Sequence, residues 1–181
     1  MKIAIIGSGF FGLATAFELL KKGHDVTVFE KETDILQGAS KKNQLRFHLG
    51  YHYPRSQATV NEVKRANKEF TKFYTNSVFG KTQNYYSISL VNSKTSLKTY
   101  LRFVSKNKLY LKKTLIPFNK SLTSEFYLSK EKNLNYFKFK NIIKKKIQKY
   151  KLNLKKNTQF LKKDLENYDK VIVSCYSGNN Q

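Results

Sequence analysis

The chain has 181 residues and a formal net charge of +23, because 35 lysines and arginines stand against 12 aspartates and glutamates. Hydrophobic residues make up 40% of the sequence, which is enough for a packed core and excludes wholesale disorder. No run of about 18 apolar residues occurs, so we expect no membrane span, and a lone cysteine, Cys175, excludes an internal disulfide and a cysteine-cluster metal site and indicates a reducing, cytoplasmic compartment.

The positive charge raises the possibility of a polyanionic partner. Only four of the basic residues are arginines, although arginine is the side chain best suited to read bases and phosphates. Lysine, asparagine, isoleucine, phenylalanine and tyrosine are abundant together, a set favoured by A/T-rich coding. We therefore expect a solvated lysine surface and no specific nucleic-acid partner, with a basic nucleic-acid-binding module as a minor alternative.

The chain begins with the pattern of a nucleotide-binding unit. Residues 3–6, Ile-Ala-Ile-Ile, form an apolar run that is typical of a strand buried on both faces of a parallel sheet. Gly7-Ser8-Gly9-Phe10-Phe11-Gly12 follows and matches G-x-G-x-x-G. Apolar residues at helical spacing predict a helix over 13–22, and 26–29 predict a second strand that ends at Glu30. A strand before the glycines, a helix after them and an acid after the next strand are the context that the motif requires.

Each position of this motif has a mechanical role. Gly7 permits the tight turn, Gly9 lets a pyrophosphate approach the backbone, and Gly12 lets the helix and strand pack closely. The amino end of the helix offers N–H groups and the positive end of its dipole to the phosphates. Glu30 can accept hydrogen bonds from ribose hydroxyls, and its charge disfavours a 2′-phosphate. The candidate cofactor-binding residues here are Gly7, Ser8, Gly9, Phe10, Phe11, Gly12, Glu30 and Lys31.

Residues 38–56, GASKKNQLRFHLGYHYPRS, form a long segment that reads as a loop. This segment concentrates two of the three histidines, His48 and His52, together with two tyrosines and two of the four arginines. Aromatic and hydrogen-bonding groups after the second strand suit a flat ring system beyond the pyrophosphate. His24 lies in the turn between the first helix and the second strand, so we assign it no chemistry.

Three stretches together resemble the FAD-dependent oxidoreductases of the D-amino-acid oxidase and glycine oxidase type. They are Gly7–Gly12 with Glu30-Lys31, then Gly38-Ala39-Ser40 with Asn43 and Arg46–Ser56, and finally Tyr168–Gly178. In many relatives the last stretch ends in Ala-Thr-Gly or Ala-Ala-Gly, whereas here Ser174-Cys175-Tyr176 stands in that place and the glycine is delayed to Gly178.

The resemblance implies FAD as the cofactor. It implies that Ser40 and Asn43 line the pyrophosphate or ribitol and that residues 48–51 lie on the isoalloxazine side. The candidate cofactor contacts in this segment are Ser40, Asn43, Arg46, His48, Gly50 and Tyr51. The reaction it implies is hydride removal from a carbon next to an amine or hydroxyl, with a small amine or amino acid as substrate. From the residues alone, an NAD-linked Rossmann oxidoreductase remains an alternative.

The remaining elements predict an α/β fold with a Rossmann-type parallel sheet and an inserted, incomplete antiparallel α+β substrate domain. The FAD-binding domain would comprise residues 1–79 and 138–181, and the partial substrate domain residues 80–137. We expect helices over 59–74, with Thr59 as N-cap, over 95–106 and in the first part of 138–154. We expect strands over 84–92, 109–116 and 125–128, at the end of 138–154, and over 169–174. By resemblance, residues 157–161 match a strand whose backbone touches adenine.

Proteins of the resembling family are longer, and their second half supplies the groups that bind the substrate carboxylate. We therefore expect a truncated or split protein, with a second chain as one source of the missing half and a non-catalytic nucleotide-binding remnant as the alternative. Whether the chain is itself an enzyme stays open, and no catalytic residue or metal ligand can be nominated. The substrate-side candidates are Tyr51, His52, Tyr53 and Arg55.

Overall fold

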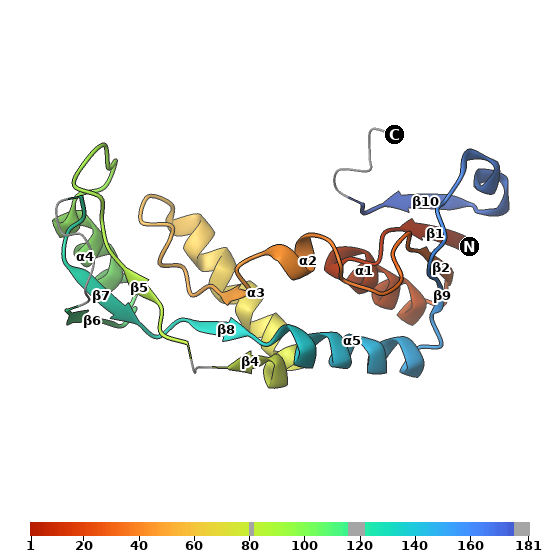
Figure 1. Cartoon of the computed structure of the whole chain (residues 1–181), viewed down its shortest axis with the longest axis horizontal. Helices are drawn as coiled ribbons and strands as arrows, with labels where there is room; N and C mark the ends of the chain where they lie inside the picture. Colours follow the sequence, from red (N-terminus) through yellow and green to blue (C-terminus); the bar gives the residue numbers. More distant parts are fainter. Residues whose placement is uncertain (80–81, 116–121, 176–181) are drawn as a thin grey trace. The chain divides into compact units, whose positions relative to one another are not determined.

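The computed structural model describes residues 1–79, 82–115 and 122–175 and divides them between two compact units (Figure 1). Unit 1 comprises residues 1–44 and the chain from residue 136 onward, and unit 2 comprises residues 45–135. Tyr176 and Gly178, which belong to the third stretch of the family resemblance, lie outside the described residues.

Unit 1 is built on a four-stranded sheet with the order β10-β1-β2-β9. All neighbouring strands in it are parallel. The strands are β1 (Lys2–Ile6), β2 (Asp25–Phe29), β9 (Asn153–Lys155) and β10 (Lys170–Val173). Ile5 of β1 lies opposite Val28 on one side and Ile172 on the other. Ile3, Ala4 and Ile5 are at most 2% exposed, so the apolar run at the start of the chain is a strand covered on both faces, as its composition predicts.

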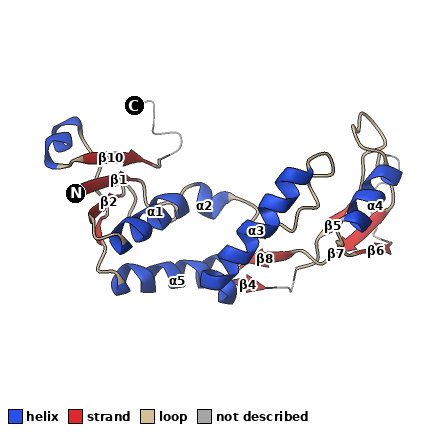
Figure 2. Cartoon of the chain, turned by 180° about the vertical axis from the view of Figure 1, so that it is seen from behind, coloured by secondary structure: helices blue, strands red, loops and turns tan. Residues whose placement is uncertain are grey.

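Unit 1 also contains four helices besides this sheet among the described residues (Figure 2). They are α1 (Phe10–Lys21), the one-turn α2 (Ala39–Lys42), α5 (Tyr136–Lys149) and the 3-10 helix η2 (Lys162–Asn167). Helix α1 buries Leu13, Ala16 and Phe17, and the ring of its first residue, Phe10, lies 5.4 Å from the ring of Phe139 in α5. The parallel sheet with its helices confirms the expected α/β class.

Unit 2 contains two small antiparallel sheets, with strand orders β3-β8-β4 and β5-β7-β6. The strands are β3 (Arg46–Phe47), β4 (Val78–Phe79), β5 (Tyr85–Tyr86), β6 (Leu111–Thr114), β7 (Phe126–Ser129) and β8 (Lys132–Leu134). The helices are α3 (Gln57–Tyr74), the 3-10 helix η1 (Thr75–Ser77) and α4 (Leu97–Lys106).

An aromatic cluster forms the core of unit 2. Its buried members are Tyr51, Val60, Tyr86, Tyr100, Phe103 and Val104. Tyr51 and Tyr86 stack with their ring centroids 4.9 Å apart. Because Tyr51 and Val60 belong to this cluster, the loop before α3 and the start of α3 pack with residues 82–115, and the compact units divide at residue 45 rather than at residue 80. The assignment of an FAD-binding and a substrate domain to particular segments stays a prediction.

Three local expectations were wrong. Helix α3 begins at Gln57 with Ser56 as its N-cap, and Thr59 is the third helical residue, whose N–H donates to Ser56 Oγ at 3.3 Å. The strand expected over 84–92 shrinks to β5, followed by a single bridge between Ser89 and Thr123. Beyond β5, Leu90 and Val91 are 63% and 55% exposed, so the apolar residues of the alternating pattern are not packed against the core there.

The strand matched by resemblance to the adenine position is also displaced. The parallel strand is β9, which ends at Lys155, and residues 157–161 are irregular. Asn157 has a positive φ of 49°, which breaks the extended path. The backbone N–H groups of Asn157 and Thr158 donate to the carbonyl oxygens of Glu32 and Glu30, so this segment still lies against the end of β2. Among the described residues, no helix is both long and apolar enough to cross a membrane.

Candidate functional site

The glycine turn between β1 and α1 has the geometry that its sequence predicts. Gly7 has a φ of +105°, and a Cβ added there would lie 2.7 Å from the carbonyl oxygen of Ser174. A Cβ at Gly12 would lie 2.1 Å from the carbonyl oxygen of Gly7. Both positions therefore exclude a side chain, the first for the tight turn and the second for the close approach of helix and turn.

Gly9 is different, because the space beside it is open. The nearest atom to a Cβ added at Gly9 would be Ser40 Oγ at 3.7 Å, an ordinary contact. Neighbouring backbone therefore does not require glycine at this position. Open space over the turn is what a phosphate group needs in order to approach the backbone N–H groups.

Glu30, which follows the end of β2, accepts hydrogen bonds from the glycine turn. Its Oε2 accepts hydrogen bonds from the backbone N–H of Ser8 at 2.9 Å and from Ser8 Oγ at 2.6 Å. Its Oε1 accepts from the N–H of Glu32 at 2.9 Å. Glu30 is 9% exposed. The structure therefore brings together the acid and the glycine motif, which the sequence separates by a helix and a strand.

The amino end of α1 is capped from α2. Gly9 is the N-cap and supplies no side chain, and the N–H of Phe10 donates to Ser40 Oγ at 3.0 Å. The first bond within the helix runs from Leu13 N–H to the carbonyl oxygen of Gly9. Ser40 thus lies at a helix N-terminus, where anions bind. Its hydroxyl can both accept from the helix and donate to a phosphate oxygen.

The side chains of the other unit 1 candidates are exposed to solvent. Phe11 is 78% exposed, and Lys31 and Asn43 are also exposed. The open space at Gly9, the positive helix end and the carboxylate of Glu30 together fit the pyrophosphate and ribose of a dinucleotide such as FAD. The individual contacts of the candidate residues stay predictions.

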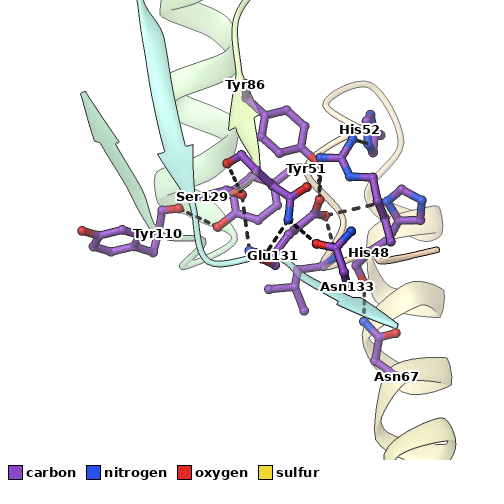
Figure 3. A network of polar contacts seen from close by, with 12 residues as sticks. His48, Tyr51, His52, Asn67, Tyr86, Tyr110, Ser129, Glu131 and Asn133 are labelled. Atoms are coloured by element: carbon purple, nitrogen blue, oxygen red, sulfur yellow. Dashed lines mark hydrogen bonds and ion pairs between the residues drawn. The ribbon is translucent and has the colours of Figure 1, made fainter. Parts of the chain in front are cut away.

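The remaining sequence candidates lie in unit 2, where Arg46, His48 and His52 surround a residue that the sequence analysis did not identify. This residue is Glu131, which takes part in a network of polar contacts (Figure 3) and whose side chain is fully buried. Its Oε1 accepts from the backbone N–H of Leu49 at 2.8 Å. Its Oε2 accepts from the Tyr86 hydroxyl at 2.5 Å and pairs with Arg46 Nη2 at 3.0 Å. Glu131 therefore joins the loop after β3 to β5 through one carboxylate.

Arg46 connects this carboxylate to the histidines. Its guanidinium lies 5.2 Å from the ring centroid of Tyr86. Its Nη1 lies 3.3 Å from His52 Nε2. The rings of His48 and His52 meet edge to face at 4.9 Å, and His48 Nδ1 is 3.8 Å from Glu131 Oε1.

One nitrogen from each histidine and one oxygen of Glu131 lie within 4.8 Å of one another, a spacing that suggests a metal site. The guanidinium of Arg46, however, already contacts both Glu131 and His52. A metal ion would have to displace this cation or sit beside it, where the two positive charges would repel each other. We therefore assign no metal to this cluster.

The protonation states follow from burial and these contacts. Burial alone would raise the pKa of Glu131, but the neighbouring His48, the hydrogen bonds that Glu131 accepts from Tyr86 and Leu49, and the charge of Arg46 hold it below the ordinary value. Burial and the neighbouring carboxylate of Glu131 raise the pKa of Tyr86. Burial, His48 and Arg46 lower the pKa of His52. At neutral pH the cluster therefore contains a carboxylate, a guanidinium, a phenol and a neutral His52.

Gly50 and Tyr51 shape the loop that carries the histidines. Gly50 has a φ of +104°, and a Cβ there would lie 3.2 Å from Val60 Cγ1. Tyr51 is 1% exposed, and its hydroxyl donates to the carbonyl oxygen of Tyr110 at 2.5 Å. Both residues are thus required by the packing of unit 2. Cofactor contacts by Arg46, His48, Gly50 and Tyr51 stay predictions.

Comparison with known proteins gives the family. A family model described as FAD dependent oxidoreductase matches residues 2–106. A similar protein is FAD-dependent monooxygenase kojA of Aspergillus flavus, 42% identical over 74 residues, which are 41% of this chain and 17% of the relative. FAD-dependent monooxygenase FPY4 of Fusarium mangiferae is 32% identical over 98 residues, 54% of this chain and 27% of the relative.

Solved structures show the same fold at low sequence identity. Glycine oxidase from Geobacillus kaustophilus aligns with a TM-score of 0.64 and 16% identity, over 87% of this chain and 46% of that one. L-α-glycerophosphate oxidase from Mycoplasma pneumoniae, solved with FAD bound, aligns with a TM-score of 0.63 and 20% identity, over 87% of this chain and 45% of that one. The chain thus spans less than half of the length of each of these proteins. Since the family model matches more than half of the chain, the chain belongs to the FAD-dependent oxidoreductase family.

Proposed function

We propose that unit 1 binds FAD and that the chain is the FAD-binding portion of an oxidoreductase acting on the C–N bond of an amine or amino acid. Bound FAD would supply the acceptor for a hydride from the substrate carbon. The Gly7–Gly12 turn and the amino end of α1 bind the pyrophosphate, and Glu30 binds the ribose of the adenosine part. A second chain that completes the substrate site and a cytoplasmic location belong to the same proposal.

The observation that carries the proposal is the pair of hydrogen bonds from Ser8 to Glu30 Oε2. These bonds hold the acid at the glycine turn before any ligand is present. A carboxylate oxygen has more than one acceptor site, and Oε1 accepts only the N–H of Glu32 among the described residues, so capacity for a ribose hydroxyl remains. The negative charge of Glu30 disfavours a 2′-phosphate, which favours FAD or NAD over NADP.

The substrate class is supported by the names of several proteins with the same fold. Besides glycine oxidase, they include L-proline dehydrogenase from P. horikoshii and L-amino acid deaminase from Proteus vulgaris. The name of each contains an amino acid or the amino acids as a class. Their identity to this chain is between 11% and 21%, so they support a class of substrate rather than one compound.

A titration of the purified full chain with FAD, followed by flavin fluorescence, tests the binding step. We expect saturable FAD binding, weaker binding of NAD, and a loss of about tenfold in FAD affinity for Glu30→Gln, because one hydrogen bond to a charged acceptor is weakened. Glu18→Gln is the matched control, since Glu18 is exposed on α1 and pairs only with Lys21 among the described residues. Urea unfolding of both variants separates lost binding from lost folding.

The outcomes distinguish the alternatives. Tighter binding of NAD than of FAD would indicate an NAD-linked oxidoreductase. FAD binding without bleaching of the flavin by glycine, L-proline or simple amines under anaerobic conditions would indicate a nucleotide-binding protein without this activity. Failure to bind either nucleotide in a folded chain would refute the proposed function.

A further inference from the structure

His52 lies at the end of a chain of polar contacts that determines its tautomer. An arginine side chain has five N–H donors and no acceptor. Because Arg46 Nη1 lies 3.3 Å from His52 Nε2, this nitrogen must accept the hydrogen bond. A neutral imidazole that accepts at Nε2 carries its proton on Nδ1.

The contact is directional because Arg46 is itself fixed. Its Nη2 donates to Glu131 Oε2 at 3.0 Å and to the Tyr86 hydroxyl at 3.2 Å, while the guanidinium lies over the Tyr86 ring. Glu131 is fixed in turn by the N–H of Leu49 and by the Tyr86 hydroxyl. Glu131 and Arg46, which lead to the imidazole, are therefore each held by at least two contacts.

The surroundings also keep His52 neutral. The charged and titratable groups that face it are Arg46, His48, Glu131, Tyr86 and Tyr53. Burial, His48 and Arg46 lower the pKa of His52, and only Glu131 opposes them. The geometry and the electrostatics thus favour the same state, an uncharged ring with the proton on Nδ1.

The protonated nitrogen is available to a ligand. His52 is an exposed residue, and within the described part of the chain its Nδ1 makes no hydrogen bond. Its ring packs against the rings of His48 and Tyr86, with centroid separations of 4.9 Å and 5.1 Å, which limits its rotation. The loop therefore presents one oriented N–H donor, on the side of the ring that faces away from the contact with Arg46.

We propose that Glu131 and Arg46 form a positioning pair that holds His52 neutral and protonated at Nδ1, and that this N–H donates a hydrogen bond to the carboxylate of the substrate. The ligand class rests on the proposed function, because an amino-acid substrate brings the carboxylate, and the His52 contact would be additional to the groups that the second half of the resembling proteins supplies. A carboxylate is a strong acceptor for an N–H donor, and the charge of Glu131 does not oppose it because that charge is paired with Arg46. Glu131 and Arg46 act through His52 and are not themselves assigned to the reacting atoms.

The test is a nitrogen-15 NMR spectrum of the imidazole groups of the full chain at neutral pH. The sequence has only three histidines, so His52→Asn and His48→Asn assign the spectrum and His24 serves as an internal control. We expect the Nδ1-protonated tautomer for His52, opposite to the Nε2-protonated form that predominates in free histidine. In Arg46→Met the His52 signal should change to the Nε2-protonated form, while Arg65→Met, an exposed arginine on α3, should leave it unchanged.

Arg46→Lys keeps the proposal testable if Arg46→Met does not fold. An ammonium group retains the charge opposite Glu131 but lacks the planar fork that spans both Glu131 and His52. We therefore expect a folded chain in which His52 returns to the Nε2-protonated form. Retention of the Nδ1-protonated form in either folded variant would overturn the role of Arg46.

Acetate is the probe for the carboxylate. We expect a saturable shift of the His52 Nδ1–H signal in the wild-type chain and about tenfold weaker acetate binding in the Arg46 variants. No shift in the wild-type chain would overturn the carboxylate assignment, and an Nε2-protonated His52 would overturn the positioning pair. Both measurements need no FAD, so failure of the FAD titration alone would refute the proposed function without altering the measured tautomer.

Discussion

Replacement of Gly9 by alanine separates ligand binding from folding at the glycine turn. Gly9 has a φ of −65° and a ψ of 174°, a conformation open to any residue. The added Cβ would meet only Ser40 Oγ, at 3.7 Å. Alanine also restricts the unfolded chain, so we expect a free energy of unfolding equal to that of the wild type or higher by about 0.4–1 kcal/mol.

The same methyl group occupies the open space in which we place the pyrophosphate. It should displace the phosphate from at least one backbone N–H group, and a hydrogen bond to a charged group contributes about 1.5–3 kcal/mol. The expected loss of FAD affinity is therefore about 10- to 100-fold. Urea unfolding gives the stability, and flavin fluorescence gives the affinity.

Gly38→Ala is the matched control for this substitution. Gly38 is exposed, and a Cβ there would meet no atom within 4 Å. Its φ of −77° and ψ of −134° lie outside the regions that alanine prefers, so we expect Gly38→Ala to lower the free energy of unfolding. Its FAD affinity should equal that of the wild type. Unchanged FAD affinity in a folded Gly9→Ala chain would show that the pyrophosphate does not approach Gly9, and a large loss of stability would show that the space at the turn is not open.

Two further predictions concern the stability of unit 1. Gly12→Ala should lower the free energy of unfolding by about 1–3 kcal/mol, because its Cβ would lie 2.1 Å from the backbone oxygen of Gly7; a wild-type urea midpoint would contradict the close packing. Burial alone would raise the pKa of Asp34, but the Lys140 ammonium, the Ile35 N–H and the Lys144 ammonium lower it from 3.8 to about 2. Its contribution to stability is therefore present above pH 3.8 and is lost as the pH falls toward 2, so the stability difference between wild type and Asp34→Asn should shrink over that interval. A difference in melting temperature that is constant from neutral pH to pH 2 would refute this ion pair.

The nucleotide turn could be predicted from the sequence because all of its parts are local. The first strand, the glycines, the first helix and Glu30 are consecutive, and each position carries a residue type that few other structures require. The contact between Ser8 and Glu30 follows from this topology, since neighbouring parallel strands bring their carboxyl ends to the same edge.

The cluster around Glu131 could not be predicted in this way. Its partners Arg46 and Leu49 precede it by 85 and 82 residues. Glu131 itself stands between Lys130 and Lys132, a context that is typical of a solvated surface. The short strands β7 and β8 on either side place it inside unit 2, and neither is long enough to leave a periodic pattern around the residue.

The displaced helix start and the lost strand have a common physical cause. Ser56 and Thr59 are both residue types that can cap a helix, so the sequence alone does not fix the first residue of α3. The start of the helix depends on the path of the preceding loop, which is held in the core of unit 2 by Tyr51. The alternation of apolar and polar residues after Tyr86 is compatible with a strand, but it is not sufficient to form one. A strand also needs a continuous partner, and the pairing described there is a single bridge between Ser89 and Thr123 with its flanking hydrogen bonds.

The two polar sites of the chain differ in what their stability requires. The bonds of Glu30 satisfy backbone N–H groups that a tight turn would otherwise leave unpaired, so the site and the fold need the same contacts. The Arg46–Glu131 pair is different, because burying two charges costs more than packing apolar side chains, and Tyr51, Tyr86 and Tyr100 already supply an aromatic core beside it. Stability alone gives no reason for a charge pair at this position. A fixed guanidinium does provide what an apolar residue cannot, a directional donor that selects one tautomer of His52, and this is why we infer that the pair serves orientation.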